Sequence, residues 1–300
     1  MIITYNLSGI IKYVSLFILP VFFSCYSPRY VYSPSTQHIP LVKKRGDFNV
    51  GGYFATGGGS SNIAHVGSQN YNAGMDLNSA YALSDHFAIM INKYNRWEKN
   101  NGANDFNIGD SSIIKYKRGL TELATGYFTV LRNHSKKSFF QLFAGVAFGK
   151  FQINDNSVNN GFHFSKFHNA NIAKIFLQPA IIIGPQENFT ASFSSRITEV
   201  FYNKINTNYS ATELDNYLLT GLSSSPVFFW EPAMNYSYAF KKPKGVRVNL
   251  QSGFTVLLNK RFIDYRTINL ALGITVNNDL FKKKVTKNGS TIKPAISTLL

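Results

Sequence analysis

The sequence is poor in cysteine, in charge and in long apolar runs. Cys25 is the only cysteine among 300 residues, so no disulfide can form within the chain. Beyond residue 24 no run of about 18 apolar residues occurs, which excludes a bundle of transmembrane helices. Charged residues make up 15% of the chain, against about 25% in an average soluble domain. Phe, Tyr and Trp together also reach 15%, and this balance is typical of a surface that partly faces lipid.

The stretch from Val246 to Val276 shows a pattern that recurs through most of the chain. Its even positions are mainly apolar and its odd positions mainly small or polar, as in Val246-Arg-Val-Asn-Leu250. Since successive side chains of a strand point to opposite faces, each segment has one apolar and one polar face. In a soluble protein the polar face would meet water. In a membrane barrel the apolar face meets lipid and the polar face lines the lumen.

About ten such segments lie between Asp47 and Phe281, an even number as bacterial single-chain barrels require. Short connections such as Ser84–His86 and Lys241–Gly245 alternate with long, Asn-rich ones such as Asn154–Gly161. Short periplasmic turns and long outer loops are typical of outer-membrane barrels. The sequence therefore predicts an all-β fold, a closed antiparallel up-and-down transmembrane β-barrel of about ten strands. The alternatives are about eight or about twelve strands, or a soluble periplasmic β-sandwich.

The N-terminal residues have the features of a bacterial export signal. Lys12 precedes an apolar run of signal-peptide length that ends at Phe23. Phe22-Phe-Ser-Cys25 resembles a lipobox, which implies a lipoprotein-type signal peptide over residues 1–24 and lipidation of the Cys25 thiol. The alternative is an ordinary secretory signal with an incidental cysteine.

The remaining boundaries follow from where the alternation begins and ends. Residues 25–46 contain prolines and no alternation, so they are expected to form an extended periplasmic tether. The barrel is expected to occupy residues 47–281. Residues 282–300 are expected to form a basic periplasmic tail, which places both termini in the periplasm.

Charged residues recur on the polar face of the predicted strands. They are Asp76, Arg96, Glu122, Lys174, Arg196, Glu231 and Arg247. Side chains largely fill the interior of a narrow barrel, and buried charge must be paired to be tolerated. These residues are therefore expected to form an ion-paired lumen network, with a narrow ion or solute channel as the alternative. Arg247 is expected to lie near Glu231 on the adjoining strand.

Lysines gather at the predicted periplasmic rim. They are Lys136, Lys137, Lys241, Lys242, Lys244, Lys282, Lys283 and Lys284. Basic residues at this level are expected to contact anionic lipid of the outer membrane. Nucleic acid is not expected as a partner, since base-stacking aromatics would have to lie among the basic residues, and here they lie on the outward faces.

No motif of a known catalytic or cofactor site occurs. The glycine run at Gly57–Gly59 lacks the lysine of a phosphate-binding loop. His163 and His168 share one long connection without an obvious carboxylate, so no metal and no cofactor is expected. A rim hydrolase of omptin-like architecture stays open as an alternative, with acid and histidine groups at the outer rim. Its candidate residues are Asp105, Asp110, His163, His168 and Asp215.

Two motifs precede the first predicted strand, Cys25-Tyr-Ser-Pro-Arg-Tyr30 and Pro40-Leu-Val-Lys-Lys-Arg-Gly-Asp47. Together with that strand they resemble outer-membrane β-barrel lipoproteins of diderm bacteria. The resemblance covers the architecture of the whole chain and implies no activity. Many such barrels end on an aromatic assembly signal, whereas this chain continues past Phe281 to Leu300. The leading hypothesis is a lipid-anchored outer-membrane barrel without catalysis, in a structural or surface-interaction role. Its long loops would contact an extracellular ligand or an envelope protein.

Overall fold

The computed structural model describes residues 29–59, 69–103, 111–133, 136–159, 162–184, 188–259 and 263–281. Within them nearly all regular structure is β-strand. The strands of the main sheet are β2 (Phe48–Gly58), β3 (Gln69–Ala82), β4 (Phe87–Ala103), β5 (Ser111–Asn133), β6 (Lys136–Asn159), β7 (Phe162–Ile183), β8 (Phe189–Thr207), β9 (Val227–Ala239), β10 (Val246–Phe254) with its continuation β11 (Val256–Leu257), and β13 (Ile268–Asn277). None of the described helices has the length and apolar composition needed to cross a membrane.

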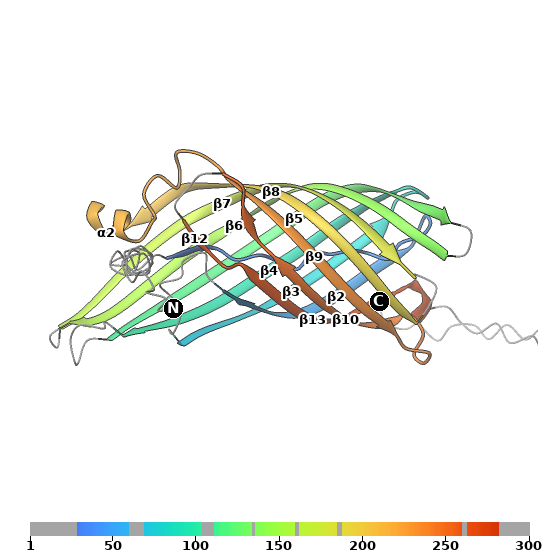
Figure 1. Cartoon of the computed structure of the whole chain (residues 1–300), viewed down its shortest axis with the longest axis horizontal. Coiled ribbons are helices and arrows are strands. Elements are labelled where there is room, and N and C mark those ends of the chain that lie inside the picture. The colour runs from blue at the N-terminus through green and yellow to red at the C-terminus, as the bar shows by residue number, and fades with distance from the viewer. Residues whose placement is uncertain are drawn as a thin grey trace, which may run out of the picture.

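The sheet closes on itself into a ten-strand antiparallel barrel (Figure 1). Each strand pairs with its sequence neighbour, and β13 pairs with the first strand β2 from Ile268↔Gly58 to Asn277↔Asn49. Closure removes the edge strands whose unpaired N–H and C=O groups would be costly in lipid. The predicted barrel is confirmed with ten strands, and the two-sheet sandwich is wrong.

The alternating residues face as the pattern requires for a membrane barrel. On β13 the side chains of Leu272 and Ile274 are 57% and 54% exposed, while those of Ala271 and Asn269 are each 2% exposed. The outward face of the barrel is therefore an apolar belt, and the lumen holds the polar side chains. A protein that folds in water places most of its large apolar side chains inside. The outward apolar belt therefore identifies lipid as the surrounding medium.

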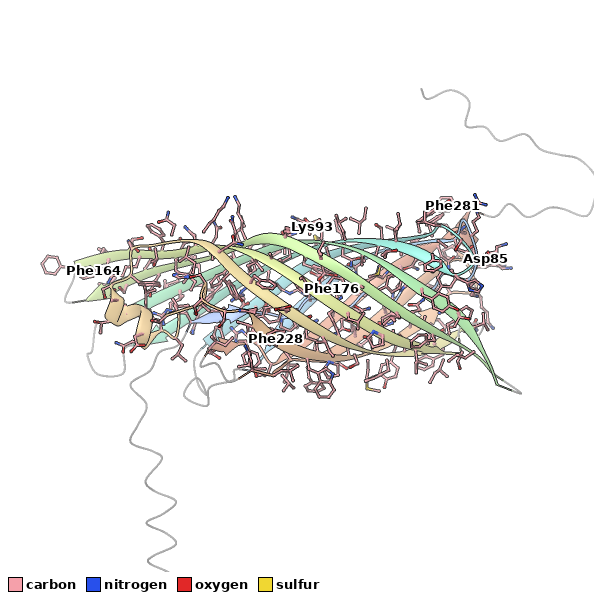
Figure 2. The ribbon with its side chains drawn as sticks, turned by 90° about the horizontal axis from the view of Figure 1, so that it is seen from above. Asp85, Lys93, Phe164, Phe176, Phe228 and Phe281 are labelled. Carbon is pink, nitrogen blue, oxygen red and sulfur yellow. The ribbon has the colours of Figure 1, made fainter. Side chains whose placement is uncertain are left out.

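The two ends of the barrel differ. At one end, the turn end, short connections such as Ser84–His86 join the strands, and Asp85 and Phe281 lie there (Figure 2). At the other, the loop end, β5, β6 and β7 extend well past their neighbours, Phe164 lies near the tip, and the short helix α2 (Ala211–Asn216) follows β8. Alternation in the sequence predicts a strand over Phe87–Trp97, and β4 continues beyond it to Ala103 near the loop end.

The chain before the first barrel strand lies inside the lumen. Residues 29–42, called the lumen segment below, are buried almost throughout, and Lys43, Lys44 and Arg45 are exposed at the turn end. The segment begins at the loop end, where the Arg29 N–H donates to the Tyr217 carbonyl. Near that end β1 (Tyr30–Tyr32) pairs in parallel with β12 (Asp264–Tyr265).

The expected external tether over residues 25–46 is therefore corrected for its described part. The backbone is extended, but residues 29–42 run through the barrel rather than beside it. The described chain begins at the loop end and stops at Phe281 at the turn end. Residues 1–28, with the predicted signal peptide and Cys25, and the predicted tail at 282–300 lie outside the described residues.

Candidate functional site

The barrel wall supplies hydrogen-bond partners to the backbone of the lumen segment. In the described part of the chain, only β1 of this segment has a hydrogen-bonded strand partner, so the other buried N–H and C=O groups need side-chain partners. The Thr36 N–H donates to Asp76 Oδ2 over 3.1 Å. The Gln37 N–H donates to Gln251 Oε1 over 2.7 Å, and Gln251 Nε2 donates to the Gln37 carbonyl over 2.8 Å. One wall glutamine thus takes the place of a partner strand at Gln37.

Further wall side chains donate to carbonyls along the segment. Gln178 Nε2 donates to the His38 carbonyl over 2.8 Å, and Tyr202 OH donates to the Val31 carbonyl over 3.0 Å. At the turn side Gln141 Nε2 donates to the Pro40 carbonyl over 2.5 Å. These contacts extend along the length of the segment, so the segment is fixed in one register within the lumen.

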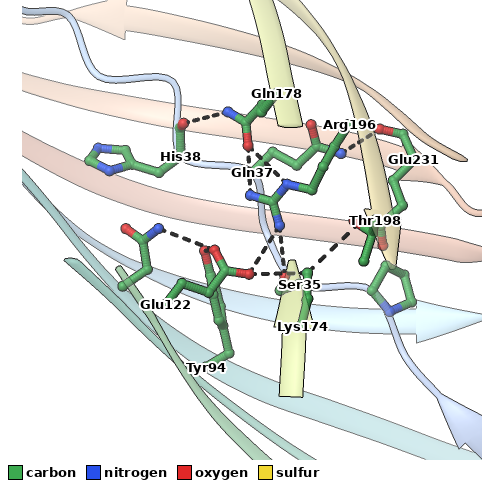
Figure 3. A network of polar contacts seen from close by, with 12 residues as sticks. Ser35, Gln37, His38, Tyr94, Glu122, Lys174, Gln178, Arg196, Thr198 and Glu231 are labelled. Atoms are coloured by element: carbon green, nitrogen blue, oxygen red, sulfur yellow. Dashed lines mark hydrogen bonds and ion pairs between the residues drawn. The ribbon is translucent and has the colours of Figure 1, made fainter. Parts of the chain in front are cut away.

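An ionic cluster lies beside the middle of the segment (Figure 3). Glu122 Oε1 lies 3.0 Å from Lys174 Nζ and 3.1 Å from Arg196 Nη1. Tyr94 OH donates to Glu122 Oε2 over 2.9 Å. Glu122, Lys174 and Arg196 are each at most 1% exposed. Burying a charge is tolerable only when it is paired and hydrogen-bonded, and this cluster meets both conditions.

Glu231 connects the cluster to the lumen segment. It accepts from Tyr32 OH over 2.7 Å and from Thr198 Oγ1 over 2.9 Å, and it lies 3.9 Å from Lys174 Nζ. Arg196 Nη1 also reaches Ser35 Oγ at 3.3 Å. The ionic cluster therefore holds the segment as well as the strands.

Two further ion-paired groups contact the segment, one at Pro34 and the other at Tyr30. Asp76 pairs with Arg96, whose Nη2 donates to the Pro34 carbonyl at 3.3 Å. Toward the loop end Glu98 pairs with Arg118, which donates to the Tyr30 carbonyl. Arg266 joins this group through a 2.9 Å contact from its Nε to Glu98.

The segment's first described residue is held at the loop end of the lumen by contacts with the wall. Arg29 Nη2 lies 2.7 Å from Asp155 Oδ2, and the Arg29 guanidinium lies 3.8 Å from the centre of the Tyr217 ring. Tyr209 OH also donates to Asp155 over 3.2 Å. These side chains come from β6 and from residues 208–226 between β8 and β9, which carry α2 at the loop end and are called the outer connection below. The outer connection therefore covers the segment.

The structure places all seven predicted lumen charges inside the barrel, each at most 9% exposed. One predicted pairing is wrong: Arg247 does not reach Glu231. Instead Arg247 Nη1 donates to Thr190 Oγ1 over 2.8 Å and to Ser237 Oγ over 3.3 Å. Glu231 lies opposite Arg196 of β8, well toward the loop end of β9, whereas Arg247 lies near the turn end opposite Ala239, so the two side chains are too far apart along the barrel to pair.

Sequence reasoning missed several charged residues of the lumen. Arg118 lies on the same polar face as Glu122, so alternation alone contained the signal. Glu98 follows Trp97, at which the predicted strand ended. Arg29 and Arg266 lie outside the barrel strands, and nothing in the local pattern marks them as buried.

A hollow remains at the turn end of the lumen. It contains about 340 Å³ of empty space, including its open mouth. Its lining includes Ile39 and Leu41 of the lumen segment, Arg247, and small polar side chains of the wall. Beyond it toward the loop end lie the ion-paired groups described above.

The residues proposed for a rim hydrolase do not meet within the described part of the chain. His163 and Asp215 are exposed, whereas His168 is 1% exposed and lies against the rings of Phe151 and Tyr209. Asp105 and Asp110 lie outside the described residues. The described residues also hold no group of three or more His, Cys, Asp or Glu side chains able to bind a metal ion.

Part of the predicted basic rim lies within the described residues. Lys241, Lys242 and Lys244 are exposed in the connection between β9 and β10 at the turn end. Lys136 and Lys137 are the first residues of β6, also at the turn end. Lys282, Lys283 and Lys284 lie outside the described residues.

The helix α2 on the outer connection has a capping box. Ser210 accepts from the Glu213 N–H, and the Ser210 N–H donates to the Glu213 carboxylate over 2.8 Å. Lys166 of β7 pairs with the same carboxylate. Partial burial raises the pKa of Glu213, but the hydrogen bonds from Lys166 and Ser210 outweigh it, so the pKa lies below its ordinary value of 4.5.

The closed sheet, the outward apolar belt and the polar lumen define a transmembrane β-barrel of the outer-membrane type. Comparison with protein-family models and with curated sequences gives no match. Among solved structures, the translocator domain of the autotransporter NalP from Neisseria meningitidis is 9% identical, with a TM-score of 0.47, over 77% of this chain and 88% of that one. The outer membrane protease OmpT from Escherichia coli is 10% identical, with a TM-score of 0.37, over 81% of this chain and 97% of that one. An outer membrane channel from Pseudomonas putida F1 is 10% identical, with a TM-score of 0.38, over 81% and 99%.

Proposed function

We propose that this protein is a non-enzymatic outer-membrane barrel whose lumen is closed by its own N-terminal segment. The observation that carries the proposal is the burial of residues 29–42 among ion-paired and hydrogen-bonded side chains of the wall. A ten-strand barrel is too narrow for a wide aqueous channel even without such a segment. Its role is then structural or lies in contacts made by the outer connections at the loop end.

Conductance in a planar lipid bilayer tests the closed lumen. The full chain, purified and inserted, is expected to give no stable single-channel steps. Stable steps from the full chain would overturn the proposal and favour the alternative of a narrow ion channel.

The path of the lumen segment also determines where the preceding residues leave the barrel. Arg29 lies at the loop end, and a few residues of extended chain span only about 3.5 Å each. If the turns face the periplasm, as barrels of this class require, the described chain begins at Arg29 on the outer side. We therefore propose that the N-terminus lies on the cell surface, in place of the periplasmic position expected from the sequence.

An epitope tag inserted between Tyr26 and Pro28 tests this orientation. Antibody is expected to bind the tag on intact cells, while the same tag placed between Lys242 and Lys244 at the turn end is expected to be accessible only after the cells are opened. The reverse pattern would show that the barrel is inserted with the opposite orientation.

Lipidation of Cys25 remains a proposal that rests on the lipobox-like sequence. An acylated Cys25 would tether the chain near the loop end, since it precedes Arg29 by four positions. Metabolic labelling with a fatty-acid analogue is expected to mark the wild-type chain and not Cys25→Ala. Labelling of both would exclude Cys25 as the acceptor.

A further inference from the structure

The outward face of three neighbouring strands carries a group of lysines on the loop side of the apolar belt. They are Lys93 and Lys99 of β4, Lys115 and Lys117 of β5, and Lys150 of β6, called the lysine patch below. All are exposed, and Lys93 points outward from the barrel surface in Figure 2. Lys93 Nζ donates to Thr121 Oγ1 over 3.1 Å.

The acids of the same strands face away from the patch. Glu98 of β4, Glu122 of β5 and Asp155 of β6 are all buried in the lumen, where each has a cationic partner. Within the described part of β4, β5 and β6 the outward face therefore carries lysines and no carboxylate. The patch has no internal counter-charge.

The register brings the lysines together. Lys99 lies directly opposite Lys115 in the β4–β5 pair, and Lys117 follows on the same face two positions along. Side chains directly opposite each other have Cβ atoms about 5 Å apart, and like charges in such pairs are destabilising. Lys150 faces Gly119, next to Lys117 on the same face of β5. An anion seated between these ammonium groups would relieve their repulsion.

The patch lies at the level where the apolar belt ends. Going toward the loop end, Ile91, Leu123 and Phe148 are the last large apolar side chains before the lysines on these strands, at 50%, 49% and 60% exposed. The next outward positions on β4 and β6 are Lys93 and Lys150. Trp97, 44% exposed, lies among the lysines. Tryptophan and basic residues at the edge of an apolar belt mark the level of lipid headgroups.

We infer that the lysine patch binds the phosphate-bearing headgroup of an anionic lipid in the leaflet on the loop side. The apolar row of Ile91, Leu123 and Phe148 contacts the acyl chains of the same lipid. The inference rests on the proposed membrane location of the barrel and is independent of the closed lumen.

The two tryptophans of the chain allow a direct test. Trp97 lies in the patch, while Trp230 lies on β9 and is 40% exposed. Trp230→Phe leaves Trp97 as the reporter, and Trp97→Phe leaves Trp230. Each variant is reconstituted in phosphatidylcholine vesicles that contain one labelled lipid, with a nitroxide near the top of its acyl chain. The labelled lipid is either phosphatidylglycerol or phosphatidylcholine. Quenching of the tryptophan fluorescence by the nitroxide is measured.

Labelled phosphatidylglycerol is expected to quench Trp97 more strongly than labelled phosphatidylcholine, with a smaller preference at Trp230. Lys99→Gln, Lys115→Gln and Lys117→Gln combined in the Trp230→Phe background are expected to lower the preference at Trp97 by as much as about a hundredfold. This corresponds to about 1 kcal/mol per lysine at about 1.4 kcal/mol per tenfold. The matched triple variant at Lys241, Lys242 and Lys244, at the turn end, is expected to leave it unchanged.

Equal quenching of Trp97 by both labelled lipids would overturn the inference. So would a preference that survives the patch variant, or one that the turn-end variant removes equally. Absence of quenching at both tryptophans would instead contradict the membrane location of the barrel, so the two failures can be told apart.

Discussion

Glu122 is the residue on which the central ionic cluster depends. Its carboxylate is the shared partner of Lys174 and Arg196, and it also accepts from Tyr94. A side chain of the same shape without the charge would leave two buried cations with one fewer counter-ion. Such a change costs much more than loss of an exposed pair, because the remaining charges stay desolvated.

Glu122→Gln is therefore expected to lower the free energy of unfolding of the vesicle-embedded barrel by roughly 3–5 kcal/mol. Denaturant titration, with the folded fraction read from heat-modifiable gel migration, measures the change. Glu213→Gln is the matched control, because its pair with Lys166 is partly exposed and pairs of this kind contribute roughly 0–1 kcal/mol. Equal effects of the two substitutions would show that the central cluster contributes no more than a surface ion pair.

For Arg247, the sequence predicts the face of the strand correctly and the partner incorrectly. Alternation placed it correctly on the inner face, because the period of a strand is fixed by backbone geometry. The predicted partner Glu231 is wrong, because the partner depends on how far the adjoining strands are staggered. The register sets Arg247 opposite Ala239, several positions from Glu231 along β9. Stagger is a property of the closed barrel and leaves no trace in one strand.

At the scale of elements, the ten barrel strands could be predicted and the lumen segment could not. Each barrel strand has one face in lipid and one in the lumen, which imposes a strict period of two. Residues 29–42 are surrounded by protein on all sides, so no period distinguishes their faces. Their prolines predict an extended tether outside the barrel. In the structure the carbonyls of Pro34 and Pro40 accept from Arg96 and Gln141.

The lumen segment depends on wall amides distant in sequence. Gln178→Leu combined with Gln251→Leu would leave buried backbone groups of Gln37 and His38 without partners, at roughly 1–3 kcal/mol for each unsatisfied group. Hydrogen exchange of the segment's amides is expected to be at least tenfold faster in this variant. Gln152→Leu, on the outward face of β6, is the matched control and is expected to leave the exchange unchanged. Unchanged exchange in the double variant would mean that packing alone fixes the segment.

The outer connection that carries α2 is expected to respond to acid. The pKa of Glu213 lies below 4.5 in the folded protein, so its contacts contribute stability above the unfolded pKa and lose it as the pH falls through the folded pKa. Protease cleavage between residues 208 and 226 is expected to accelerate as the pH is lowered below about 4.3. In Glu213→Gln cleavage is expected to be faster at neutral pH and to lose this pH dependence. Parallel pH profiles for both proteins would assign the response to another group.

For the whole molecule, the sheet and the lumen segment are separable in principle. Every barrel strand has its two neighbours without help from residues 29–42, since β2 pairs with β3 and β13. The ladder of backbone hydrogen bonds therefore closes in a chain that lacks the segment. What such a chain would lose is the filling of the lumen, and with it the partners of the wall residues Gln141, Gln178 and Gln251.

A variant that joins residue 28 directly to Lys43 is expected to fold as a less stable barrel that conducts ions. Water would enter along the vacated path, because the wall side chains left without partners are polar and need hydrogen bonds. Planar-bilayer recording is expected to show small single-channel steps from this variant and none from the full chain. Heat-modifiable migration of the same sample establishes that the barrel is folded. A folded variant without conductance would show that the inward side chains close the lumen unaided, and the segment would then serve to carry the N-terminus through the barrel.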